Sequence, residues 1–114
     1  MKLRIILISA IIMISNLLFA ENFETDTFKT KSNKEVVITF IKHGSLMLSY
    51  DGLYIQVDPV TMFADYSTFP KADFILVTHE HGDHLDIKAI NNLTKEDTRI
   101  IINQSSRDII SKGD

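Results

Sequence analysis

The chain has 114 residues, of which 45% are hydrophobic and 24% are charged, a balance typical of a small globular domain. Twelve basic and 15 acidic side chains leave a formal net charge of −3, and the sequence has no basic stripe of the kind that binds nucleic acid. The absence of cysteine excludes disulfide bonds, thiolate metal ligands and a cysteine nucleophile.

Residues 1–20 have the pattern of a secretory signal peptide. Lys2 and Arg4 form a basic head, an uncharged apolar stretch follows, and the stretch ends at the small residue Ala20. As a helix this stretch would reach about 24 Å, which is less than the roughly 30 Å hydrocarbon core of a membrane. We therefore predict cleavage after Ala20 and export to the periplasm or the medium, without a stable membrane anchor. An uncleaved N-terminal anchor is the alternative.

The next segments predict a lead-in, a strand and a hairpin. Residues 21–35 are polar and predict a solvated lead-in, whereas residues 36–41 are β-branched and aromatic, which favours a strand. Asp51-Gly52 separates two alternating runs and predicts a two-residue turn, because both turn positions need positive φ. In each run the apolar residues share one face of the strand: Leu46, Leu48 and Tyr50 in the first, and Leu53, Ile55 and Val57 in the second.

A strand, loop, helix and strand follow the hairpin. The apolar runs 74–77 and 99–102 predict strands that are buried on both faces. Apolar residues at helical spacing predict a short helix over residues 85–93. Ser105 or Ser106 could begin a last helix, and Gly113 could end it. This order predicts an α/β fold with one right-handed crossover.

Residues 79–84 hold three of the four histidines of the chain, in the sequence His-Glu-His-Gly-Asp-His. His79 and His81 lie two positions apart, so an extended backbone directs both imidazoles to one side. Asp83 and His84 follow Gly82, which permits a sharp bend. Imidazole and carboxylate groups bind zinc, manganese and iron, and α/β proteins place ligands at the carboxyl ends of strands. A metal site is favoured over a solvated loop that contains histidines by chance.

The stretch from Thr78 to Asp86 resembles the T-H-x-H-x-D-H-x-D signature of the metallo-β-lactamase fold. His43-Gly44-Ser45 and the segment ending in Asp58-Pro59 are similar to the branch with ascorbate-6-phosphate lactonase and N-acylphosphatidylethanolamine phospholipase D. The resemblance implies that residues 36–114 are the N-terminal half of an αββα sandwich. Members of the family take further ligands from later in the chain, and no histidine follows His84 here, so we expect a truncated reading of a longer protein.

The resemblance also implies a site for two divalent metal ions, zinc in the first place, with manganese or iron as alternatives. His79 and His81 would hold the first ion, and Asp83 and His84 the second. Asp83 would also orient the attacking water, which makes it the expected catalytic residue. The implied reaction is hydrolysis of an ester, lactone or phosphodiester in a small molecule or a lipid. The alternative is a non-catalytic fragment that binds metal weakly or not at all.

Three further residues have two interpretations each. Asp58 could cap a turn, or its carboxylate could support the metal ligands from behind. Asp86 could be the acidic residue of the first helical turn, a partner of the ligands, or both. His43 could line the mouth of the pocket, or it could only end a strand.

Overall fold

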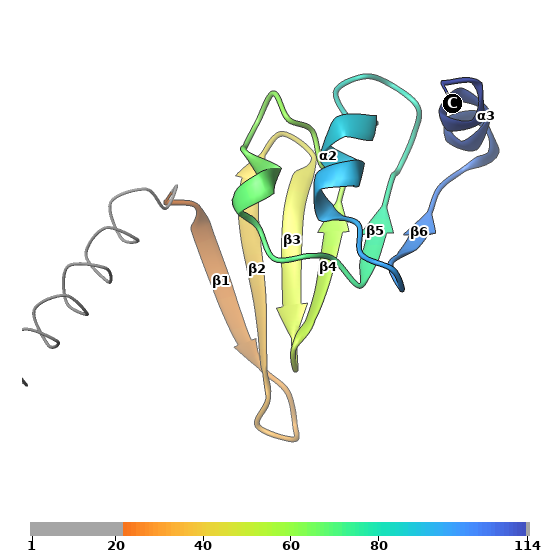
Figure 1. The fold of residues 1–114 in the computed structure, drawn as a ribbon. Coiled ribbons are helices and arrows are strands. Elements are labelled where there is room, and N and C mark those ends of the chain that lie inside the picture. Colours follow the sequence, from red (N-terminus) through yellow and green to blue (C-terminus); the bar gives the residue numbers. More distant parts are fainter. Residues whose placement is uncertain (1–21, 114) are drawn as a thin grey trace, which may run out of the picture.

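A single mixed sheet organises the chain in the computed structural model, which describes residues 22–113 (Figure 1). The six strands lie in the sheet in sequence order: β1 (Glu24–Lys29), β2 (Glu35–Lys42), β3 (Ser45–Tyr50), β4 (Leu53–Val57), β5 (Phe74–Leu76) and β6 (Arg99–Ile101). The first four strands pair antiparallel, whereas β4 with β5 and β5 with β6 pair parallel. Three helical elements complete the fold: the 3-10 turn η1 (Tyr66–Thr68), α2 (Ile87–Leu93) and α3 (Gln104–Lys112). The predicted α/β class is confirmed. The predicted signal peptide lies outside the described residues.

The β3–β4 hairpin forms as its turn residues predict. Asp51 and Gly52 have φ values of 49° and 82°, and Tyr50 pairs directly with Leu53. Positive φ at both central positions is the geometry that suits the right-handed twist of the flanking strands. The ladder places Leu48 opposite Ile55, so the apolar positions of the two runs share one face.

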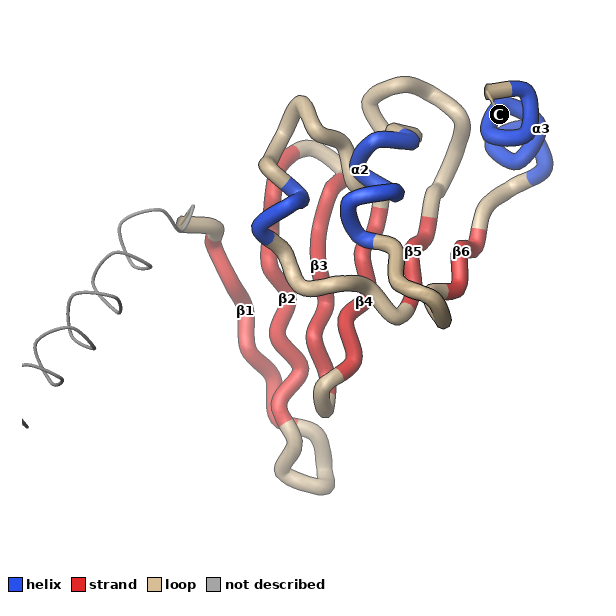
Figure 2. Tube along the Cα trace, in the orientation of Figure 1, coloured by secondary structure: helices blue, strands red, loops and turns tan. Residues whose placement is uncertain are grey.

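Helical turn η1 and helix α2 cover one face of the sheet, whereas α3 lies beyond the end of β6 (Figure 2). Ile75 of β5 packs there in one cluster with Tyr66 of η1 and Leu93 of α2, and all three are fully buried. Gln56, the register partner of Ile75, shares this face and is also fully buried. The opposite face carries most of the apolar strand residues, which are half-buried or exposed among the described residues. The covered face is therefore the more polar one.

Two strands differ from the sequence prediction. Part of the predicted lead-in forms β1, which pairs with β2 from Glu24 to Lys29 while all six of its side chains stay exposed. Backbone pairing with β2 builds this edge strand, and such pairing leaves no hydrophobic pattern in the sequence. The predicted burial of residues 99–102 is wrong for β6, because Arg99, Ile100 and Ile101 are all exposed.

The helix ends also move by a few residues. Helix α2 begins at Ile87, not at Leu85, because Asp86 caps it with its side chain. Leu85 precedes the helix as a buried member of the core. Asn103 caps α3 in place of the predicted serines, and Gly113 ends that helix as expected.

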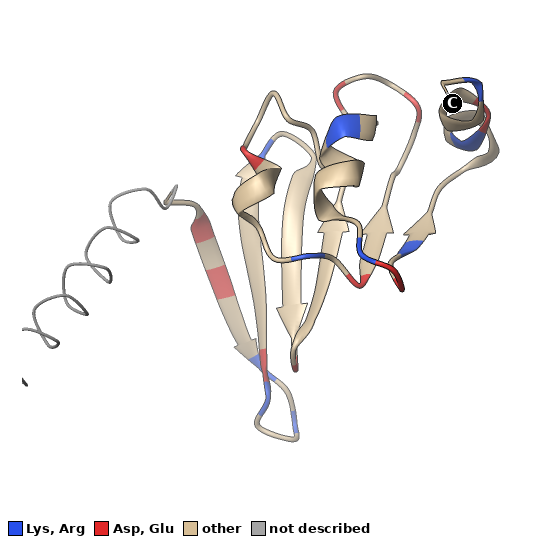
Figure 3. Cartoon of the chain, in the orientation of Figure 1, with Lys and Arg blue, Asp and Glu red and all other residues tan. Residues whose placement is uncertain are grey.

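Charged side chains lie around the sheet and not at its centre (Figure 3). Strands β3 and β4 contain no charged residue. Ion pairs join Lys34 to Asp51 at 2.5 Å and Lys95 to Asp73 at 2.7 Å. Among the described residues, no helix has both the length and the apolar character needed to cross a membrane.

Candidate metal centre

The His-rich segment leaves the sheet at the carboxyl end of β5. The Val77 amide continues the parallel ladder by donating to the Ile101 carbonyl at 3.0 Å. The His84 and Leu85 amides then donate to the His81 carbonyl at 2.9 and 2.8 Å, which closes a tight turn. The turn ends at Leu85, whose buried side chain anchors the segment to the core. The segment therefore lies where the sequence predicted it, after a strand and before a helix.

Five side chains from two loops form two groups of metal-binding type. His79, His81 and Asp83 make up one group, and His43, Asp83 and His84 make up the other. Within each group the ligand atoms all lie within 4.8 Å of one another. The structure thus brings together the four candidate ligands named from the sequence and places His43 beside them. Asp83 is common to both groups.

The distances around the imidazole rings show how closely the cluster is packed. The His79 ring lies 3.9 Å from that of His84 and 4.7 Å from that of His81, measured between centroids. Asp83 Oδ2 lies 3.0 Å from His43 Nε2 and 3.6 Å from His84 Nε2. His84 is largely covered, whereas half of the Asp83 side chain is exposed. A small molecule can therefore reach Asp83 from solvent.

Asp58 supports this cluster from inside the protein. Its side chain is 2% exposed and accepts three hydrogen bonds. The Thr78 amide donates to Oδ1 at 2.7 Å, and the Thr78 hydroxyl and His84 Nδ1 approach Oδ2 at 2.6 and 2.8 Å. Of the two interpretations of Asp58, its contact with the candidate ligand His84 favours a supporting position over a turn cap alone. Asp58 itself has a φ of 44°, a left-handed conformation that is uncommon outside glycine.

Asp58 fixes the tautomers of two histidines. An ionised carboxylate only accepts hydrogen bonds, so His84 must carry its proton on Nδ1. The Thr78 hydroxyl donates to Asp58, so it accepts from His79 Nδ1, which lies 2.9 Å away. Both rings then have a lone pair on Nε2, the atom left to bind a metal. The donor set therefore fits a divalent cation of the zinc type.

The charge on Asp83 suits the same role. Partial desolvation raises the pKa of Asp83, but the hydrogen bond from its own amide and the interactions with His84 and His43 outweigh it. The pKa of the carboxyl group therefore lies below its usual value, and Asp83 is ionised at neutral pH.

Asp86 supports α2 and not the ligand atoms. Its Oδ1 accepts from the Lys88 and Ala89 amides, and its Oδ2 accepts from the Thr61 amide and hydroxyl at 2.7 and 2.5 Å. Burial raises the pKa of Asp86, yet the Thr61 and helix hydrogen bonds outweigh it, so the pKa is lowered overall. Asp86 is therefore the N-cap of α2 and lies one position before the first turn, in which the sequence predicted it. Thr61 was missed from the sequence, because a lone threonine 25 positions upstream gives no signal.

Gly44 and Ser45 fit the β2–β3 turn to the cluster. A Cβ atom on Gly44 would lie 2.9 Å from His84 Cε1 and 3.1 Å from its Nδ1, so only glycine leaves room for the ring. The Ser45 hydroxyl donates to the Asp58 carbonyl at 2.5 Å. By contrast, Gly82 has no positive φ, and a Cβ there would meet nothing. The chain turns at this position as expected, but the turn does not require glycine.

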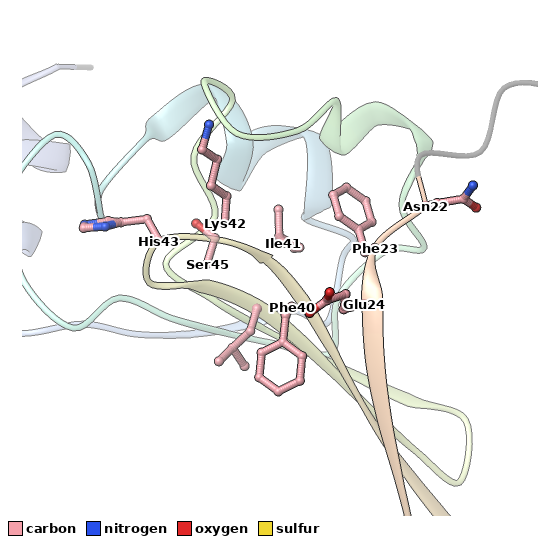
Figure 4. Close-up of a pocket in the computed structure, with 9 residues that line it drawn as sticks. Asn22, Phe23, Glu24, Phe40, Ile41, Lys42, His43 and Ser45 are labelled. Atoms are coloured by element: carbon pink, nitrogen blue, oxygen red, sulfur yellow. The ribbon is translucent and has the colours of Figure 1, made fainter.

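A hollow beside the upper end of β2 adjoins the cluster (Figure 4). Its lining includes Phe23, Phe40 and Ile41 together with His43 and Ser45. The His43 side chain points away from the phenyl rings of Phe23 and Phe40 (Figure 4). The hollow holds none of the other ligand candidates, so we place the candidate site at the cluster and not in this hollow.

Comparison with known proteins identifies the class. Residues 37–111 match the family model of the beta-lactamase superfamily domain, and the chain therefore belongs to this family. A crystal structure from Parabacteroides distasonis, named as a metal-dependent hydrolase, superposes with a TM-score of 0.77 and 64% sequence identity. The match covers 79% of this chain and 41% of that one.

Two curated relatives agree with the metallo-β-lactamase fold expected from the signature. A UPF0173 metal-dependent hydrolase of Flavobacterium johnsoniae is 45% identical over 60 residues, which is 46% of this chain and 26% of that protein. The N-acyl-phosphatidylethanolamine-hydrolyzing phospholipase D 1 of Caenorhabditis elegans is 26% identical over 98 residues, 69% of this chain and 26% of that protein. The chain spans about a quarter of the length of these relatives.

Proposed function

We propose that this chain forms the metal-binding part of a hydrolase that cleaves an ester, a lactone or a phosphodiester. The observation that carries the proposal is the position of Asp83, which belongs to both groups of candidate ligands. Two adjoining groups of this kind fit a site for two neighbouring divalent cations, of which zinc suits these ligands best. Such cations would lower the pKa of a bound water toward neutrality and supply a nucleophile.

The residues of the chain would have separate roles in this reaction. Asp83 is ionised and half exposed, so it can orient a water against an incoming substrate. Asp58 and Thr78 would hold the His79 and His84 rings in the tautomer that offers Nε2. Because these supports are buried or backbone-bound, the ligand atoms need little rearrangement when a cation arrives.

The substrate class is proposed from the relatives. The names of the Flavobacterium and Parabacteroides proteins state metal-dependent hydrolysis, and the name of the Caenorhabditis protein states hydrolysis of a phospholipid. These names favour a small molecule or a lipid that contains an ester or phosphodiester bond. The net charge of −3 supports a substrate other than nucleic acid.

The test is hydrolysis by the purified chain after removal of metals with a chelator and reloading with zinc, manganese or iron. Bis-p-nitrophenyl phosphate, a p-nitrophenyl ester and a chromogenic lactone represent the three bond types. Because members of the family take further ligands from later in the chain, we expect no appreciable turnover by these 114 residues alone. A longer chain that supplies those ligands should hydrolyse at least one of the three substrates in a metal-dependent way, and Asp83→Asn should abolish this activity. The matched control is Glu80→Gln, a carboxylate of the same loop that contacts Asn103 and belongs to neither ligand group.

A non-catalytic metal-binding role is the second candidate. The exposure of Asp83 and His43, each 50% exposed, favours it, because catalytic sites exclude water to strengthen their electrostatic interactions. Stable metal binding without turnover of any of the three substrates, in a longer chain that supplies the later ligands, would establish this alternative and refute the hydrolase.

We also propose export, on the charge and hydropathy of residues 1–20. N-terminal sequencing of protein recovered from the periplasm or medium should begin near Glu21. Protein that keeps Met1 and remains with the membrane would show an N-terminal anchor instead.

A further inference from the structure

Lys42, the last residue of β2, is turned out of the regular alternation of its strand. Phe40 pairs with Leu46 and Lys42 pairs with Ser45, so β2 has one residue more than β3 between these two pairs. The extra residue is Ile41, and the irregularity is a β-bulge. In a regular strand the side chains of Ile41 and Lys42 would point to opposite faces. Here both rise on the same side of β2, and Phe40 points to the other side (Figure 4).

The hollow beside β2 lies where this bulge ends the pairing with β1. Strand β1 pairs with β2 as far as Glu24 opposite Phe40, and no residue of β1 pairs with Ile41 or Lys42. Residues of both strands line the hollow, with Phe23 and Ile41 as part of its apolar lining. Its volume of about 340 Å³ is within the range of small-molecule sites. The hollow can therefore hold a small organic group.

His43 connects the hollow to the candidate metal centre. It lines the hollow, and its Nε2 lies 3.0 Å from Asp83 Oδ2. Its ring also packs 5.0 Å from the ring of His84, measured between centroids. A molecule whose reacting bond lies at the metal centre can therefore extend past His43 into the hollow. Of the two interpretations of His43, this position favours the mouth of the pocket over a residue that only ends a strand.

The side chain of Lys42 supplies a positive charge beside this route. Lys42 is exposed, and no carboxylate among the described residues forms an ion pair with it. Lys34 and Lys95, by contrast, form ion pairs with aspartates. Glu24 also lines the hollow, but it lies beside Phe40 and away from the Lys42 ammonium group (Figure 4). An ammonium group in this position can bind a carboxylate or a phosphate.

We propose that the hollow binds the part of the substrate that does not react, and that Lys42 binds an anionic group on that part. Ile41 and Phe23 would contact an apolar segment next to the anion. The substrate class is then an ester, lactone or phosphodiester that carries a further carboxylate or phosphate and a short apolar segment. The inference rests on the hydrolase proposed above, but binding of the anionic part can be measured without turnover.

The first experiment measures binding to the metal-free chain, so that an anion cannot bind through a cation. Hexyl phosphate and hexanoate are the probes, 1-hexanol is the matched neutral compound, and the amide NMR signals of Phe23 and Ile41 report on the hollow. We expect both anions to bind more tightly than 1-hexanol. Lys42→Gln should weaken their binding at least about ten-fold, because a charge-assisted hydrogen bond is lost, and Lys42→Arg should retain it. The control is Lys31→Gln, an exposed lysine that does not line the hollow.

The second experiment uses a longer chain that supplies the later metal ligands. Its substrates are mono-p-nitrophenyl adipate, which has a distal carboxylate, and p-nitrophenyl hexanoate, a neutral ester with an acyl chain of the same length. Lys42→Gln should lower kcat/KM at least about ten-fold for the adipate ester and leave it unchanged for the hexanoate ester. An equal loss for both esters would show that Lys42 does not select for an anion.

Three results of the binding experiment would overturn the inference: anionic probes that bind no better than 1-hexanol, unchanged binding in Lys42→Gln, or an equal loss in Lys31→Gln. Sedimentation with vesicles of phosphatidylcholine and phosphatidic acid distinguishes the two sources of the anion. Retention on the vesicles that depends on Lys42 would identify a lipid headgroup, and probe binding without such retention would identify a soluble compound. Binding of the anionic probes without hydrolysis of either ester by the longer chain would refute the proposed reaction and leave this binding site in place.

Discussion

At the scale of single residues, Asp58 has the most connections to the candidate site. Its two carboxylate oxygens accept from Thr78 and His84, and Thr78 in turn accepts from His79. One buried charge therefore determines the state of two imidazoles. Although this carboxylate is buried, it contributes to the site because it selects which nitrogen of each ring faces the cation.

Replacing Asp58 by asparagine should show this dependence. An amide nitrogen at the Oδ2 position cannot accept from the Thr78 hydroxyl and His84 Nδ1, so the His84 tautomer should change and metal affinity should fall about 10–100-fold. ¹⁵N NMR of the His84 ring and a Zn²⁺ titration measure the two effects. Asp26→Asn, on the exposed strand β1, is the control. An unchanged tautomer in Asp58→Asn would contradict the role of this carboxylate.

The two glycines near the cluster give a second prediction. Gly44→Ala should displace the His84 ring and weaken metal binding, because the added methyl group would lie 2.9 Å from Cε1. Gly82→Ala should change unfolding free energy by no more than about 0.5 kcal/mol, because its Cβ meets nothing. Urea unfolding and Zn²⁺ titration of both variants make the comparison. Equal effects at the two positions would show that the turn does not constrain His84.

At the scale of elements, α2 and the loop after β4 are joined by Asp86. The carboxylate caps the helix and accepts from Thr61 at the same time. Asp86→Ala should cost about 1–2 kcal/mol of unfolding free energy through the lost cap. Urea unfolding at pH 7 measures it, with Asp97→Ala as the control, since Asp97 is 81% exposed and only 3.7 Å from Lys95.

The effect of Asp86 should also depend on pH in a defined direction. Its pKa is lower in the folded protein than in the unfolded chain, so its stabilisation is present above the usual carboxyl pKa of about 4. It is lost as the pH falls through the lower, folded value. The difference in unfolding free energy between wild type and Asp86→Ala should therefore shrink below about pH 4. A difference that grew on acidification would mean that Asp86 does not stabilise the fold as a carboxylate.

The sequence predicted the local elements better than it predicted which distant residues these elements contact. The Asp51-Gly52 turn, the crossover helix and the position of the His-rich loop are encoded in neighbouring residues, so the sequence was sufficient for them. Strand β1 is stabilised by pairing with β2, and no residue pattern in this polar segment indicates that pairing. His43 gave only an ambiguous signal for the same reason, because its contact with Asp83 spans 40 positions.

At the scale of the whole molecule, the sheet has its more apolar face uncovered by the described residues. Leu48 and Ile55 pair at the centre of that face, where neither strand carries a charge. Phe40 and Leu53 are 44% and 43% exposed on the same side. An exposed apolar face of this kind binds other apolar surfaces in water.

We therefore expect the purified chain to bind a hydrophobic dye such as ANS and to self-associate. Leu48→Glu should reduce both effects while the chain stays folded, because the added charge lies on the uncovered face. Ile75→Glu is the matched variant on the covered face, where it should unfold the core. Sedimentation velocity and circular dichroism read out association and folding. A monomer that binds no dye would show that this face is not available.

The spacing of the candidate ligands has a consequence for how a cation would influence folding. His79, His81, Asp83 and His84 lie within six positions, so an unfolded chain can also gather them around a cation. A ligand stabilises a fold only by the difference between its affinities for the folded and unfolded states. That difference must come from groups that folding alone delivers, above all the buried support of Asp58, which reaches His84 across 26 positions. Added metal should therefore raise the stability of this chain by less than its affinity implies, with most of the gain contributed by the buried carboxylate of Asp58.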